Sequence, residues 1–244
     1  MEDNDLDQPS DEEWSELLNK ARLQAEAGSV EFQMFLAQAY QDGYGVTPDL
    51  EEAKKLLLVA AEQGHAEAYY ELGDICYSLG NSKKEAFDWF VKAAELGYTK
   101  AHTQLSFMCM YGHGIENDET LAFSWKLKAA ELGDKDAMYG LGGSFEHGIG
   151  VPVDINDAVS WYKKAAQIGH VAAQLELSLI YSERDAIPKD YISSYAYALA
   201  AAESGSKEAP DLRAALEEKM TAEQVKNAKQ LAVEMMTSGY KNSV

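Results

Sequence analysis

The five histidines are the residues of this chain best suited to bind a metal ion or to transfer a proton. They are His65, His102, His113, His147 and His170. None of them forms a His-x3-His or His-Glu-x2-His pattern, the spacings that bring two metal ligands onto one helix face. His65 and His170 each directly follow a glycine that recurs along the chain, which favours a structural role in a turn. The sequence therefore predicts neither a metal site nor a cofactor.

Possible nucleophiles and phosphate-binding turns give no better support for catalysis. Ser144 follows two glycines, but the chain has no Gly-x-Ser-x-Gly motif that would place it on a strand-to-helix turn. The turn Gly43-Tyr44-Gly45 lacks the third glycine, the Lys-Ser/Thr pair and the preceding strand of a phosphate-binding loop. Because no acid, base and nucleophile converge, we expect this protein not to be an enzyme.

A sequence repeat determines the secondary-structure elements that would position any functional site. Six glycines recur along the chain, with four gaps of 36 residues and one of 33. These repeat glycines are Gly28, Gly64, Gly97, Gly133, Gly169 and Gly205. A fixed period of this length is typical of a repeat array, in which each unit packs only against its neighbours.

Each period is predicted to contain two helices. In the first helix, the residues 4, 8 and 12 positions after the glycine share one helix face, and the middle one is always leucine. In the second helix, a large residue precedes a pair of alanines, so that large and small side chains can interdigitate. These large residues are Leu56, Trp89, Trp125, Trp161 and Tyr197. The predicted N-caps of the second helices are Asp49, Asp118, Asp154 and Asp190, and the repeat glycine is predicted to end each second helix.

The fourth period carries the residues of a known repeat most clearly. It contains Tyr139-Gly140-Leu141-Gly142, Gly148-Ile149-Gly150-Val151 and Trp161-Tyr162-Lys163-Lys164-Ala165-Ala166. In this order the motifs resemble the Sel1-like repeat of bacterial proteins, a relative of the tetratricopeptide repeat. The resemblance covers about residues 29 to 205. It implies an all-α fold, a right-handed α/α superhelix (solenoid) of five helix-turn-helix repeats, and a protein-binding adaptor of the kind found in secretion, envelope and signalling settings.

The repeat register also predicts how the chain is divided. The predicted order is an acidic, disordered tail (1–12), an N-terminal capping helix (13–28), five repeats (29–64, 65–97, 98–133, 134–169 and 170–205) and a C-terminal helical cap (206–244). In the last segment, Pro210 can open one helix, and Thr221 with Gln224 can form a capping box for another. The final helix either caps the array or docks a second protomer, so the choice between monomer and dimer stays open.

The net charge excludes several classes of partner. The chain has 21 Lys and Arg against 41 Asp and Glu, a net charge of −20. A field of this sign repels the phosphates of nucleic acids and of anionic membranes, so we expect neither as a partner. Solubility is the simplest reason for such a charge, and attraction to a basic protein is the alternative. No run of 18 apolar residues occurs, and therefore we expect no membrane insertion.

The expected location of the protein is the cytoplasm. The first residues are acidic, whereas a secretory signal has a basic start followed by an apolar stretch. The two cysteines, Cys76 and Cys109, share one position of consecutive first helices and are predicted to be small buried residues in a reducing compartment.

The predicted binding surface is the inner wall of the superhelix, which the first helices form. Residues three, six, ten and thirteen positions after each glycine are not needed for the core and should point into this groove. The predicted partner-binding residues are Met34, Tyr70, Asp74, Tyr77, Phe107, Met110, Tyr139 and Glu146. Exposed aromatic side chains are favoured anchors in protein interfaces. The alternative is that tight curvature of the superhelix buries some of these residues against the next first helix.

The function predicted from these features is that of a non-enzymatic adaptor. Its groove is expected to take an extended or helical segment of another protein, and a basic segment would suit its charge. One alternative is an immunity or antitoxin protein that neutralises a basic effector toxin, as the bacterial relatives suggest by resemblance. A second alternative is a regulatory partner of a signalling enzyme.

Overall fold

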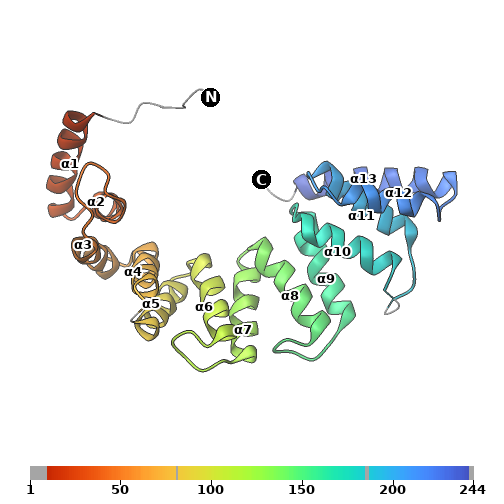
Figure 1. Cartoon of the computed structure of the whole chain (residues 1–244), viewed down its shortest axis with the longest axis horizontal. Helices are drawn as coiled ribbons and strands as arrows, with labels where there is room; N and C mark the ends of the chain where they lie inside the picture. Colours follow the sequence, from red (N-terminus) through yellow and green to blue (C-terminus); the bar gives the residue numbers. More distant parts are fainter. Residues whose placement is uncertain (1–9, 81, 185–186, 242–244) are drawn as a thin grey trace. The chain divides into compact units, whose positions relative to one another are not determined.

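The computed structural model describes residues 10–80, 82–184 and 187–241 (Figure 1). These residues form thirteen α-helices and no strand, which confirms the predicted all-α repeat protein. The chain divides into two compact units, of which the first ends at Asn117 and the second begins at Asp118. Among the described helices, none has an apolar stretch of the length that a bilayer span requires.

The helices alternate as the repeat predicts. The first helices of the five repeats are α2 (Val30–Asp42), α4 (Ala66–Ser78), α6 (Thr99–Tyr111), α8 (Lys135–His147) and α10 (Val171–Ser182). The second helices are α3 (Leu50–Glu62), α5 (Lys83–Glu95), α7 (Glu119–Glu131), α9 (Ile155–Gln167) and α11 (Tyr191–Glu203). Within the first unit α4 packs against α5, and within the second unit α8 packs against α9.

Further helices flank the repeats at both ends. Helix α1 (Asp11–Glu26) begins two residues earlier than predicted, because Ser10 and Glu13 form a capping box at its start. The rest of the predicted acidic tail, residues 1–9, lies outside the described residues. At the other end stand α12 (Ala209–Glu217) and α13 (Ala222–Lys241). The predicted capping box of α13 is confirmed, since Thr221 and Gln224 exchange hydrogen bonds of 2.8 and 3.2 Å.

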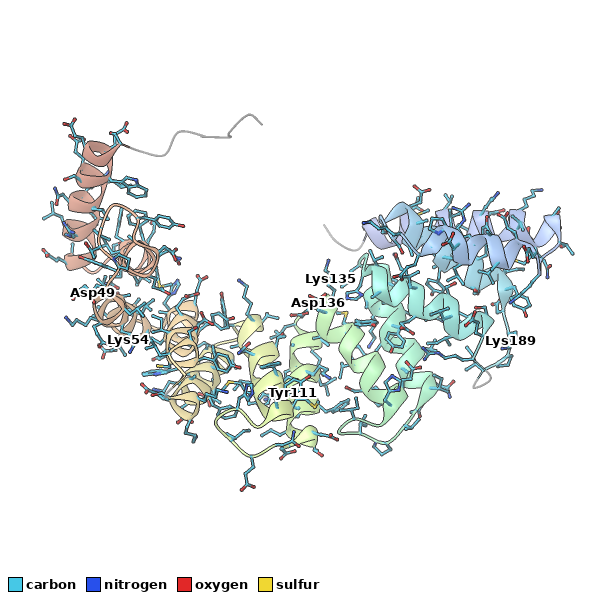
Figure 2. All side chains as sticks on the ribbon, in the orientation of Figure 1. Asp49, Lys54, Tyr111, Lys135, Asp136 and Lys189 are labelled. Atoms are coloured by element: carbon cyan, nitrogen blue, oxygen red, sulfur yellow. The ribbon has the colours of Figure 1, made fainter. Side chains whose placement is uncertain are left out.

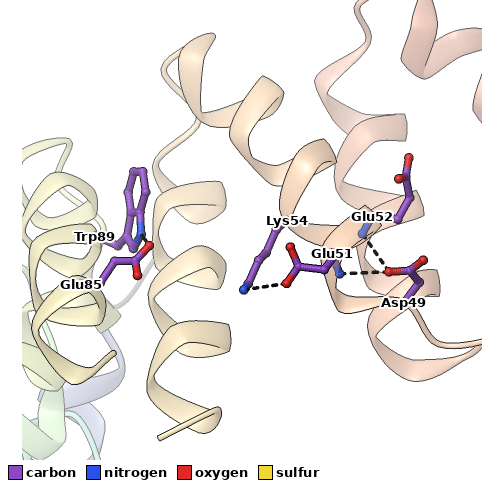
Figure 3. A network of polar contacts seen from close by, with 6 residues as sticks. All are labelled: Asp49, Glu51, Glu52, Lys54, Glu85 and Trp89. Carbon is purple, nitrogen blue, oxygen red and sulfur yellow. Dashed lines mark hydrogen bonds and ion pairs between the residues drawn. The ribbon is translucent and has the colours of Figure 1, made fainter. Parts of the chain in front are cut away.

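The helix ends follow the predicted chemistry. Asp49 Oδ1 accepts hydrogen bonds from the backbone N–H groups of Glu51 and Glu52 at 3.0 and 3.1 Å, and Lys54 pairs with Glu51 beside them (Figure 3). Such caps satisfy amides that have no partner inside the helix. Asp118, Asp154 and Asp190 cap α7, α9 and α11 in the same way. All six repeat glycines have φ between +81° and +94°, the left-handed region in which glycine meets no steric penalty.

In the second and fourth repeats, an aromatic ring of the second helix packs directly against a glycine of the first helix. A Cβ atom on Gly142 of α8 would lie 2.4 Å from the ring of Tyr162 of α9, and a Cβ on Gly73 of α4 would lie 2.7 Å from the ring of Phe90 of α5. Phe90 and Tyr162 are almost completely buried. In the second and fourth repeats, the large side chain that meets the glycine is therefore the residue directly after the predicted tryptophan.

The tryptophans themselves are only half-buried. Lys92 Nζ lies 4.0 Å from the ring centroid of Trp89, and Lys164 Nζ lies 3.5 Å from that of Trp161. A lysine over an indole ring is a favourable cation–π contact. The tryptophans thus line the border of the core, where their rings cover apolar surface and carry a charged neighbour.

We predict that replacing the glycine at the ring contact destabilises the protein. Gly142→Ala should lower the free energy of unfolding by about 1–3 kcal/mol, because the new methyl group overpacks the site against Tyr162. Gly143→Ala is the matched control on the same helix. Its Cβ would meet only the Tyr162 hydroxyl, at 3.7 Å, so it should raise stability by up to about 1 kcal/mol through helix propensity. Urea unfolding followed by circular dichroism measures both, and equal effects of the two changes would contradict the proposed contact.

Candidate functional site

One stripe of α4 combines carboxylates with aromatic rings. It contains Glu67, Tyr70, Glu71, Asp74 and Tyr77, whose spacing of three or four residues places them along one side of a helix. Glu67 and Asp74 are exposed, and the other three are half-buried. The carboxylates and aromatic rings of this stripe thus reach the surface together.

An aromatic cluster lies where the carboxyl ends of α4 and α6 meet. It consists of Tyr77, Phe107, Tyr111 and His113. The ring centroids of Phe107 and Tyr111 are 4.7 Å apart, and those of Phe107 and His113 are 5.4 Å apart. The Tyr77 hydroxyl lies 2.7 Å from His113 Nδ1, within hydrogen-bond distance. The predicted residues Tyr77 and Phe107 are therefore brought together by a histidine between them.

Two rings of this aromatic cluster face solvent. Phe107 is 42% exposed and Tyr111 is 63% exposed. Tyr111 is at the last residue of α6 and is labelled in Figure 2. Large exposed aromatic side chains that rest on a packed base are typical of residues that anchor protein interfaces.

The amino end of the stripe is held by a second tyrosine. The Tyr98 hydroxyl donates a hydrogen bond of 3.2 Å to Glu67, and the Tyr98 ring packs 5.2 Å from that of Tyr70. Burial, together with the negative charge of Glu67, raises the pKa of Tyr98 to about 12. Tyr98 therefore stays protonated and keeps Glu67 oriented over the whole physiological pH range.

Glu71 is the electrostatically unfavourable member of the stripe. Its pKa is raised first by burial and then by the neighbouring charges of Asp74 and Glu67. A hydrogen bond from Gln41 and the charge of Lys100 act in the opposite direction without cancelling the effect. The negative charge of Glu71 is thus held at a cost in free energy to the folded protein.

The other predicted residues have different surroundings. In the first unit, Met34 is half-buried and packs against the core around Leu57 and Leu72, and Met110 is half-buried near the end of α6. Tyr70 also rests on Phe90 of α5, at 5.2 Å between centroids. These contacts leave Asp74, Tyr77 and Phe107 as the predicted residues that best combine exposure with proximity to one another.

In the second unit, the predicted residues are engaged within the protein. Tyr139 stacks on His170 at 4.6 Å and lies 5.5 Å from Tyr162. Glu146 accepts a hydrogen bond of 2.8 Å from the Tyr162 hydroxyl and forms an ion pair with Arg184. Its side chain is only 9% exposed. The role of Tyr139 and Glu146 in partner binding stays a prediction, and the structure gives both an internal role as well.

Sequence reasoning missed residues of the stripe and of the aromatic cluster and around them, and it also missed Arg184, the ion-pair partner of Glu146 in the second unit. The missed residues are Glu71, Tyr98, Tyr111, His113 and Arg184. Glu71 and Tyr111 stand seven and fourteen positions after their repeat glycines, next to the predicted positions six and thirteen. Because a helix has 3.6 residues per turn, a stripe along one side of it includes residues at two adjacent sequence positions. His113 is the middle residue of a Gly-x-Gly turn, and Arg184 belongs to the loop in which the fifth repeat lacks that turn.

Metal and thiol chemistry find no support among the described residues. No group of three or more His, Cys, Asp or Glu side chains in that part of the chain could hold a metal ion. Cys76 and Cys109 are free thiols and buried, as predicted. Burial raises the pKa of Cys76, which makes its thiolate scarce at neutral pH.

The repeats correspond to a known family. The Sel1 repeat matches residues 30–65, 66–98, 99–134, 135–170 and 171–206 without a gap. The chain belongs to the Sel1 repeat family. Each match is shifted by one residue from the predicted repeats, so the matches keep the spacing of the repeat glycines. Proteins of the Sel1 repeat family are generally non-catalytic scaffolds for protein interactions.

A comparison with solved structures finds similar proteins. A Sel1 repeat protein from Oxalobacter formigenes is 27% identical, with a TM-score of 0.70, and the match covers 91% of this chain and 97% of that one. A protective antigen of uropathogenic Escherichia coli is 26% identical, with a TM-score of 0.47 and coverages of 95% and 60%. An immunity protein from Pseudomonas aeruginosa is 23% identical, with a TM-score of 0.49 and coverages of 86% and 78%.

We predict that removing the charge of Glu71 stabilises the protein at neutral pH. Because the pKa of Glu71 is raised on folding, the native state binds its proton more tightly, and stability falls as pH rises above the usual glutamate value. Glu71→Gln should therefore raise the midpoint of urea unfolding at pH 7, and this gain should shrink toward pH 4. Glu62→Gln, at an exposed position of α3, is the control and should change little at either pH. A gain that is the same at both pH values would rule out this electrostatic origin.

Proposed function

We propose that this Sel1 repeat protein is a non-catalytic protein-binding module and that the aromatic cluster of its first unit is part of the binding surface. The observation that carries the proposal is the exposure of Phe107 and Tyr111 on a base of packed aromatic rings. Burying such rings removes a large apolar area from water when a partner binds.

The base of the aromatic cluster supports binding because it is ordered before a partner arrives. The Tyr77 hydroxyl and His113 Nδ1 already satisfy each other at 2.7 Å. Lys83 Nζ also lies 5.7 Å from the ring centroid of Tyr77. A surface whose side chains are already held loses less conformational entropy on association, which leaves more of the contact energy for affinity.

The charge of the chain favours a protein over other classes of partner. With a net charge of −20, the molecule repels the phosphate groups of nucleic acids and anionic lipids. A protein segment can supply both apolar side chains for the aromatic cluster and a charge of opposite sign. Binding of another protein is therefore the function that combines the family, the charge and the exposed rings.

We predict that removing the two exposed rings weakens partner binding without unfolding the protein. The double variant Phe107→Ala with Tyr111→Ala should lower affinity by at least about 2 kcal/mol if both rings are anchors. Its circular dichroism should match that of the wild type, because both side chains are exposed. Partners are first captured from a lysate of the source cells and identified by mass spectrometry, and their affinity is then measured with purified proteins by calorimetry.

A matched control for this experiment lies on α3. Leu58→Ala with Val59→Ala also removes two exposed apolar side chains, 38% and 47% exposed, outside the stripe of α4. It should leave affinity within about twofold of wild type. If both double variants bind the partner with equal affinity, the aromatic cluster is not the binding surface. If the partner is a basic toxin that the chain inhibits, the narrower alternative of toxin neutralisation is supported.

A further inference from the structure

We infer that the first unit recognises a basic, extended segment of its partner protein, with an apolar side chain on the aromatic cluster and a lysine or arginine against the carboxylates of α4. This inference rests on the proposed function and specifies its partner. It draws on two features that adjoin along α4: the aromatic cluster with the exposed rings of Phe107 and Tyr111, and the carboxylates of Glu67, Glu71 and Asp74.

The two features are continuous along α4. Asp74 precedes Tyr77 by three residues, Glu71 by six and Glu67 by ten. With a rise of 1.5 Å per residue, these three residues lie about 4.5 to 15 Å from Tyr77 along the helix axis. An extended segment advances about 3.3 Å per residue. A basic side chain two to five residues away from an apolar anchor would therefore reach the carboxylates while the anchor contacts the rings.

The carboxylates of the stripe are only partly offset by positive charge within the described part of the chain. None of Glu67, Glu71 and Asp74 forms a salt bridge with another described residue. Glu67 is oriented by Tyr98, a neutral hydroxyl, and Lys100 only partly offsets the neighbours of Glu71. A cation from the partner would relieve the repulsion among three like charges, which is the complementarity that selects a basic segment.

The aromatic rings favour arginine over lysine as the basic residue of the segment. An arginine guanidinium can stack on an aromatic face and can also pair with a carboxylate through two hydrogen bonds. The exposed rings of Phe107 and Tyr111 and the exposed carboxylate of Asp74 offer one group of each kind. The segment is thus expected to carry arginine more often than lysine at the position nearest to the anchor.

A random-peptide display library tests the inference directly at the level of peptide sequence. The wild-type protein should enrich peptides with an aromatic or large aliphatic residue and a basic residue two to five positions away. The triple variant Glu67→Gln, Glu71→Gln, Asp74→Asn should still enrich the apolar residue but lose the preference for the basic one. Glutamine at position 67 can still accept the Tyr98 hydrogen bond, so the variant is expected to keep its fold.

The control variant makes the same change in net charge elsewhere. Glu26, Glu62 and Glu95 are exposed and each stands two residues before a repeat glycine. Replacing all three by glutamine should leave the enriched motif unchanged. For one selected peptide, fluorescence anisotropy should show that the triple variant of α4 loses about fivefold in affinity, since one exposed ion pair is worth up to about fivefold. The control variant should lose less than about twofold in affinity. The affinity of the wild type should decrease when the salt concentration is raised from about 0.05 M to about 0.5 M.

The outcomes separate this inference from the proposed function. Peptides without basic residues that still require Phe107 and Tyr111 would overturn the inference and leave protein binding at the aromatic cluster standing. Equal losses in the two charge variants would also overturn it, because the overall charge alone would then explain the preference. If the wild type enriches no peptide, the inference fails, and the capture experiment with the aromatic double variant decides the proposed function independently.

Discussion

The contact between a buried ring and a glycine in the facing helix is the constraint on which the rest of this structure depends. Phe90 lies on Gly73 in the second repeat and Tyr162 lies on Gly142 in the fourth. Since no Cβ separates ring and backbone, the two helices of a hairpin approach closely and bury the alanines and leucines around the contact. Helix α5 packs against α4 through this contact, whereas Glu67 and Asp74 of α4 are exposed to solvent.

Much of the fold could be predicted from residues whose local chemistry decides their conformation. The repeat glycines end helices because they adopt positive φ, and the four aspartates begin helices because a carboxylate can accept free amides. These signals act over a few residues, so one sequence is enough to interpret them. The start of α1 was predicted two residues too late because Asp11 and Glu12 were assigned to the acidic tail, whereas the capping box of Ser10 with Glu13 starts the helix at Asp11.

The candidate site was less predictable because it depends on contacts between distant residues. Tyr77 meets His113 across 36 residues, and Glu146 meets Arg184 across a loop whose path the repeat pattern does not determine. Positions counted along one ideal helix also mark only the centre of a stripe. For this reason Glu71 and Tyr111 were missed, since each is one residue away from a predicted position. The sequence was enough to predict which side of a helix carries the candidate residues. It was not enough to predict which side chains from other elements contact them.

The placement of Gly73 and Asp74 next to each other on α4 has an evolutionary consequence. Gly73 lies at the contact between the two helices of the hairpin, while the side chain of Asp74 is exposed to solvent. Descendants of this gene can therefore exchange surface residues on α4 and acquire new binding specificities without any compensating change in the interior. A scaffold with this separation can diversify by ordinary point mutation, one repeat at a time.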